Sequence, residues 1–192
     1  MMKQRTFLLL ALFGAMTFSA TAQVEHKKGH DSHTMPAKAS KKSLSLHTMA
    51  MAMVGGAHVH IDYSAPSVRD RIIFGGLVAF DRVWQAGAHN ATWLKTDKDL
   101  LIAGKVLPAG KYGFFLIPGK EEWTVIFNSR WEQHGKDDYN EAEDVLRFTV
   151  TPKNLKEVQE QLTYEVNKTG ERSGEIVFSW EKKKITIPFQ VK

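Results

Sequence analysis

The sequence of 192 residues contains no cysteine and no apolar run long enough to cross a membrane. Without cysteine, a disulfide framework, a thiol nucleophile and a thiol-linked lipid anchor are all excluded. The longest N-terminal apolar run, Phe7 to Phe13, falls short of the roughly 20 residues that a membrane helix needs. We therefore expect no membrane span in the mature chain.

Recognisable catalytic motifs are also missing. The chain has no Gly-x-Ser-x-Gly elbow, no His-Glu-x-x-His pair and no glycine-rich phosphate loop between a strand and a helix. This absence favours a protein that is not an enzyme. A metal-dependent hydrolase with residues that no motif reveals stays open as an alternative.

The N-terminus has the form of an export signal. Lys3 and Arg5 precede the apolar run, and the small residues Ala-Thr-Ala at 20–22 match a signal-peptidase site. The sequence therefore predicts a signal peptide over residues 1–22. The mature protein is expected in the periplasm or outside the cell.

Residues 23–43 are rich in Lys and His and have no apolar period, which predicts a disordered linker. This linker holds side chains able to bind a soft or borderline metal: His26, His30, His33 and Met35. Residues 44–192 hold 19 of the 26 basic and 19 of the 21 acidic residues, so the folded domain is neutral. A neutral domain argues against nucleic acid as a partner.

The clearest β pattern lies in the middle of the domain. The apolar runs Tyr112–Ile117 and Trp123–Phe127 flank Pro118-Gly119-Lys120-Glu121, which predicts a hairpin. Because both faces of these strands are apolar, each must be covered, either by a second sheet or by a long loop. The predicted core residues are Phe114, Phe115, Leu116, Trp123, Val125 and Phe127.

Other short alternating segments extend this pattern across residues 44–192. Strands are expected at 46–54, 57–64, 100–102, 105–107, 145–151, 162–167, 175–180 and 184–191, with turns at 168–170 and 181–183 and two further strands around a bulge at Gly87. Residues 129–144 are expected to form a loop or a short helical turn. The sequence thus predicts one all-β domain, an antiparallel β-sandwich of short strands with at most short helices.

The first expected hairpin would place an unusual set of side chains together. A two-residue turn at Gly55-Gly56 pairs Met53 with His58 and Met51 with His60, and it also pairs Met49 with Asp62. Thioethers and imidazoles on one face suit a soft ion such as Cu(I). The alternative is that the methionines fill the core and the histidines are only solvated.

The chain also resembles a known family. The segments YSAPSVRDRIIFGG, VWQAGAHNAT, LPAGKYGFFLIPG and EEWTVIFN are similar to the secreted bacterial family named domain of unknown function 2911, over about residues 57–192. The resemblance implies a secreted, mostly β domain and no assigned activity. Many relatives have Arg, Asn and Glu where this chain has Gln85, His89 and Asn90, and Trp in place of His134. This chain is therefore similar to a histidine-bearing branch.

Two binding hypotheses follow from the sequence. In the first, His58, His60, His89 and His134 converge at one end of the sandwich and bind zinc or copper. In the second, exposed aromatic side chains bind a glycan, a peptide or another envelope protein; the candidates are Trp84, Trp93, Trp131 and Tyr139. Four unrelated surface histidines, and tryptophans that belong to the core, are the respective alternatives.

Overall fold

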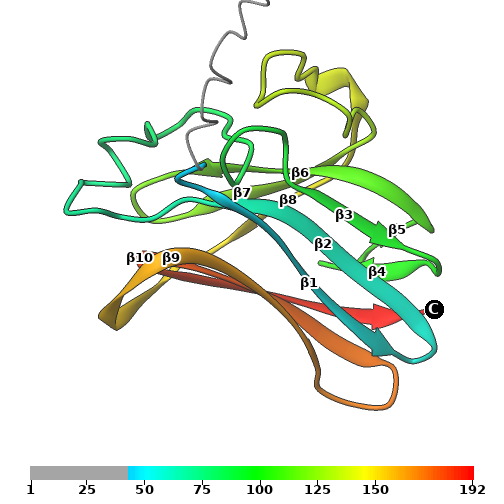
Figure 1. Ribbon diagram of the computed structural model, residues 1–192. Coiled ribbons are helices and arrows are strands. Elements are labelled where there is room, and N and C mark those ends of the chain that lie inside the picture. The colour runs from blue at the N-terminus through cyan, green and yellow to red at the C-terminus, as the bar shows by residue number, and fades with distance from the viewer. Residues whose placement is uncertain (1–42) are drawn as a thin grey trace, which may run out of the picture. The chain divides into compact units, whose positions relative to one another are not determined.

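The computed structural model describes residues 43–192, which form two antiparallel β-sheets in two layers (Figure 1). The larger sheet has six strands in the order β1-β2-β3-β6-β7-β8, and the smaller has four in the order β5-β4-β10-β9. This architecture confirms the predicted all-β sandwich. The predicted signal peptide and nearly all of the His/Lys-rich linker, including His26, His30, His33 and Met35, lie outside the described residues.

Within residues 43–192, the strands follow one another with a single 3₁₀ turn, Glu141–Glu143, between β7 and β8. Their bounds are β1 Leu46–Val54, β2 Ala57–Ala65, β3 Trp93–Thr96, β4 Leu100–Ile102, β5 Lys105–Leu107, β6 Gly110–Pro118, β7 Trp123–Asn128, β8 Asp144–Val150, β9 Lys153–Lys168 and β10 Ser173–Val191. Among residues 43–192, no helix is long and apolar enough to cross a membrane.

The hairpins predicted from turn residues are present. Gly55 and Gly56 both have positive φ angles, 56° and 75°, and link β1 to β2. The register pairs Met53 with His58 and Met51 with His60, as the turn predicts. The small hairpin of β4 and β5 also has its predicted bounds.

The β6–β7 hairpin is buried on both faces. The six predicted core residues, Phe114, Phe115, Leu116, Trp123, Val125 and Phe127, are all 0% exposed. Most belong to the large cluster between the sheets, whereas Phe115 joins Ile126 and Ala91 in a second cluster. The second cluster is packed against Val83, Ile117 and Tyr139. Both expected covers are therefore used, since a second sheet lies on one face and loop residues lie on the other.

The C-terminal strands are longer than predicted. The expected turn at 181–183 was wrong, because β10 continues through it with a bulge at Glu181, whose φ is 53°. The polar segment 153–161 was not predicted as a strand. It extends β9 by pairing with β10, as Lys183 faces Asn154 and its Nζ donates to the Oδ1 of Asn154 at 2.8 Å. This part of β9 forms through pairing with its neighbour, without an apolar period of its own.

The two strands expected around Gly87 were also wrong. Residues 66–92 form a long loop with only isolated bridges, one of which pairs Trp84 with Leu116. The chain turns at Ala86 and His89, whose φ angles are 53° and 60°. These positive angles interrupt an extended strand, so a regular strand begins only at Trp93.

Truncation of the central hairpin should destabilise the whole domain. Phe115→Ala and Trp123→Ala each remove a fully buried aromatic side chain, which typically costs about 3 to 5 kcal/mol of unfolding free energy. We expect the melting temperature to fall on the order of 10 °C in each variant. Val158→Ala, at a position 49% exposed on β9, is the control and should leave the melting temperature nearly unchanged. If both aromatic variants melt within about 2 °C of wild type, the hairpin is not the core.

Candidate functional site

The outward face of β1 and β2 gathers thioethers and imidazoles. Met49, Met51 and Met53 are 50%, 50% and 58% exposed, and their strand partners are Asp62, His60 and His58. The methionines therefore do not fill the core, which is the commoner place for this residue type. The rings of His58 and His60 lie 5.9 Å apart between centres, in an edge-on arrangement.

His60 is partly buried on this face. Its ring packs against Trp93 at 4.9 Å between centres, and its Nε2 is buried with no hydrogen-bond partner among the described residues. Burial lowers the pKa of His60, and the neighbouring His58, Lys111 and Lys95 lower it further against the opposing effect of Asp62. The imidazole of His60 is therefore neutral at pH 7 and keeps a free lone pair.

Asp62 ends the row and is already engaged. The Nε2 of His47 donates to Oδ1 of Asp62 at 2.8 Å, across the β1–β2 pair. His47 was not among the predicted site residues. Its signal was present in the sequence, because the alternation that exposes Met49 places residue 47 on the same face.

A cation lies between the two tryptophans next to this face. The Nζ of Lys111 lies 3.7 Å from the ring centre of Trp93 and 3.3 Å from that of Trp131. Such cation–π contacts occupy faces of both indole rings. One face of each indole ring, in Trp93 and in Trp131, is therefore already occupied by Lys111.

The other two predicted aromatic candidates are also part of the folded structure. Trp84 is 9% exposed and stacks on Trp180 at 5.6 Å between ring centres. Tyr139 packs edge-on against Phe115 at 5.1 Å, and its hydroxyl lies 2.9 Å and 3.0 Å from the two carboxylate oxygens of Asp144. Binding of a glycan, a peptide or an envelope protein through these rings stays a prediction.

His89 and His134 lie on two loops that pair with each other. The N–H of Gly135 donates to the carbonyl of His89 at 2.8 Å, and Asn90 forms an isolated bridge with His134. The Nε2 of His89 lies 3.1 Å from the hydroxyl of Ser43, and the Nδ1 of His134 lies 3.5 Å from a carboxylate oxygen of Asp137. The Gly135–His89 hydrogen bond and the Asn90–His134 bridge bring the two loops together.

The four predicted histidines thus fall into two pairs, one on β2 and one on the paired loops. Trp93 contacts His60, and it lines a hollow with Trp131 and His134. Within residues 43–192, no group of three or more His, Asp and Glu side chains is arranged to hold a metal ion. Convergence of all four histidines on one ion stays a prediction.

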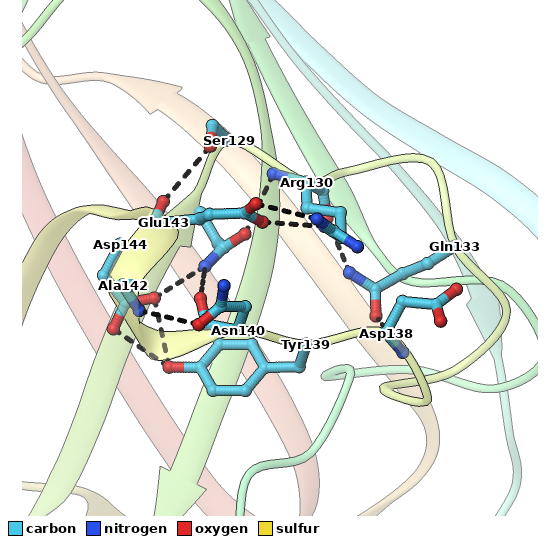
Figure 2. A network of polar contacts seen from close by, with 10 residues as sticks. Ser129, Arg130, Gln133, Asp138, Tyr139, Asn140, Ala142, Glu143 and Asp144 are labelled. Carbon is cyan, nitrogen blue, oxygen red and sulfur yellow. Dashed lines mark hydrogen bonds and ion pairs between the residues drawn. The ribbon is translucent and has the colours of Figure 1, made fainter.

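A polar network holds the loop that carries His134 (Figure 2). Arg130 forms two hydrogen bonds to Glu143, at 2.7 and 2.8 Å, and the Nδ2 of Asn128 donates to Asp144 at 2.8 Å. Burial, followed by the hydrogen bond to Asp144, raises the pKa of Tyr139 well above its ordinary range. Tyr139 therefore stays protonated and donates to Asp144 at every physiological pH.

The sequence of the domain matches a family model described as a protein of unknown function, DUF2911, over residues 45–189. The chain belongs to the DUF2911 family. No curated protein and no solved structure matches the chain. The match confirms the family resemblance and covers both histidine pairs of this DUF2911 domain, but it assigns no activity to them.

Loss of the Tyr139 hydroxyl should destabilise the 129–144 loop without removing the packing of the Tyr139 ring on Phe115. Tyr139→Phe keeps the ring on Phe115 and removes the hydrogen bonds to Asp144, so we expect a loss of about 1.5 to 3 kcal/mol. Hydrogen exchange of residues 129–144 should accelerate. Tyr112→Phe is the matched control, because the Tyr112 hydroxyl donates to the carbonyl of Pro108, which lies outside the 129–144 loop. Equal exchange in this loop for both variants would contradict the proposed role of Tyr139.

Proposed function

We propose that the domain binds a soft monovalent metal ion, Cu(I), on the outward face of β1 and β2. The observation that carries this proposal is the row of three exposed methionines whose strand partners include two histidines. Thioether sulfur is a soft ligand that favours Cu(I), and imidazole nitrogen is compatible with it. The proposal keeps His58 and His60 from the predicted histidine site and replaces the two loop histidines with methionines.

The separation of the two imidazoles is compatible with one shared ion. Metal-to-imidazole bonds are about 2.0 Å long, so an ion lies about 3.2 Å from each ring centre and two such rings stand at most about 6.4 Å apart. The observed 5.9 Å between the ring centres of His58 and His60 lies within that limit. Facing residues on paired strands have Cβ atoms about 5 Å apart, so the flexible side chains of Met51 and Met53 can reach the same ion.

The surroundings of His60 also favour metal binding. Its buried Nε2 makes no hydrogen bond among the described residues, and an unsatisfied buried polar atom is costly. A bound ion would supply the missing partner to this ring. Asp62, held by His47, carries a carboxylate on this face that would offset part of the repulsion between a bound cation and the nearby Lys95 and Lys111.

Cuprous ion titrated against the chelator bicinchoninate, without oxygen, tests the proposal. The full-length chain would carry His26→Asn, His30→Asn, His33→Asn and Met35→Leu, so that the candidate ligands of the predicted 23–43 linker are removed. We expect one tightly bound ion. Met51→Leu with Met53→Leu should weaken binding more than about tenfold. Even residues that only hydrogen-bond to a metal ligand change the metal affinity about 10- to 100-fold when they are mutated.

A matched histidine comparison separates this site from the four-histidine site. His58→Asn with His60→Asn should abolish tight binding, whereas His89→Asn with His134→Asn should leave it unchanged. If the loop pair also abolishes binding, all four histidines contribute and the methionine site is wrong as stated. Wild-type affinity in both the Met51/Met53 and the His58/His60 variants would exclude this face.

The pH dependence of binding follows from the pKa of His60. Because that pKa lies below the ordinary value of 6.5, protons compete with the metal for this ring only in more acidic solution. We expect the Cu(I) affinity to change little between about pH 8 and pH 6.5 and to fall as the pH is lowered further. Replacement of His60 by Asn should remove this His60 contribution to the pH dependence. A Cu(I) affinity that falls steeply between pH 8 and pH 7 would contradict this role of His60.

A further inference from the structure

A cavity of about 470 Å³ lies beneath the 66–92 loop, and the soft-metal proposal does not use it. This volume is in the range that small organic ligands occupy in proteins, about 300 to 1,000 Å³. The stacked indole rings of Trp84 and Trp180 form part of its wall, and Lys136 reaches it from the 129–144 loop. The two paired loops and the core between the sheets therefore build the cavity together.

The loop over the cavity is fixed to the sheet at several points. Trp84 exchanges two backbone hydrogen bonds with Leu116, at 2.8 and 2.9 Å, and the N–H of Ala88 donates to Ser64 at 3.1 Å. The carbonyl of Ala86 accepts hydrogen bonds from the hydroxyls of Thr92 and Tyr164, at 3.1 and 2.8 Å. Ala86 is held with a positive φ by these contacts. Non-glycine residues in such conformations are costly and tend to occur at ligand sites.

The charges around the cavity have one sign. Its thirteen lining residues include the cations Arg82 and Lys136 and contain no Asp or Glu. The domain as a whole has equal numbers of acidic and basic residues, so this bias is local to the cavity. A site lined by cations and lacking carboxylates favours an anionic ligand.

The rest of the lining is mainly apolar. Leu77 lines the cavity and is 53% exposed, so it offers an apolar surface to a ligand there. Trp180 adds a buried Nε1 donor that has no hydrogen-bond partner within residues 43–192. We infer that this cavity binds a small amphipathic monoanion, a carboxylate on an alkyl chain, with the carboxylate at Arg82 and Lys136 and the chain along Leu77 and Trp84.

Decanoate, kept below its micelle concentration, is the probe that tests this inference. Binding to the full-length protein is followed by calorimetry and by the total tryptophan fluorescence, to which Trp84 and Trp180 contribute. We expect saturable binding of decanoate that is at least tenfold tighter than that of acetate, which lacks the chain. Decyltrimethylammonium has the same chain with a positive head and should bind at least tenfold more weakly than decanoate. Equal or tighter binding of the cation, or no saturable decanoate binding, would overturn the inference.

Two exposed positions on the same loop give a matched pair of variants. Leu77→Glu places a carboxylate beside the cavity and should weaken decanoate binding more than tenfold. Ile72→Glu introduces the same charge at a side chain that is 76% exposed and does not line the cavity, so affinity should be unchanged. Arg82→Gln should also weaken decanoate binding, because it removes a cation proposed to hold the carboxylate, while leaving the melting temperature nearly unchanged. Equal effects of Leu77→Glu and Ile72→Glu would show that the cavity is not the site.

Discussion

Burial of the β6–β7 hairpin on both faces is the constraint on which the rest of the domain depends. Toward the second sheet, Trp123 packs against Phe74 and Phe178 at 4.6 and 5.8 Å between ring centres. On the other face, Phe115 and Ile126 are fully buried although no sheet lies over them. Exposure of these two side chains to water would cost the fold several kcal/mol of stability, so loop residues have to cover them.

This requirement explains why the two long loops are so closely held. Val83 and Tyr139, one from each loop, pack over the second apolar cluster, and the Arg130–Glu143 pair and the Asp144 network fix the second loop to β7 and β8. The backbone contacts between the two loops then place His89 and His134 close to each other. The paired loops also bound the cavity, so its walls are supported by the same contacts that cover the core. Loops held on a rigid β scaffold in this way are common positions for binding residues.

The β1–β2 hairpin lies beyond this loop cover. Its inward residues Val59 and Ile61 are fully buried, while the alternate residues face outward and include the exposed methionines. Period-two alternation therefore separates the structural role of the hairpin from the side chains proposed to bind a metal. Substitutions on the outward face can change ligand chemistry with little loss of core packing, which makes this face suited to functional variation. The loop cavity has no such separation, because Trp84 and Trp180 serve both the core and the cavity wall.

Local sequence determined the features that depend on short-range geometry. Glycine at 55 and 56 supplies the two positive φ angles of a tight turn, and that turn alone sets the register that places Met51 opposite His60. The apolar runs of the central hairpin likewise identify a core that has to be covered on both faces.

Only the tertiary structure decided which segments provide the cover, that the polar residues 153–161 extend a strand, and that the chain turns at Ala86 and His89. These outcomes depend on partners distant in sequence, such as Leu116 for Trp84 and β10 for β9, and no local period or turn residue encodes such a partner. The pairing of the loops that carry His89 and His134 has the same origin, because it depends on contacts between segments distant in sequence.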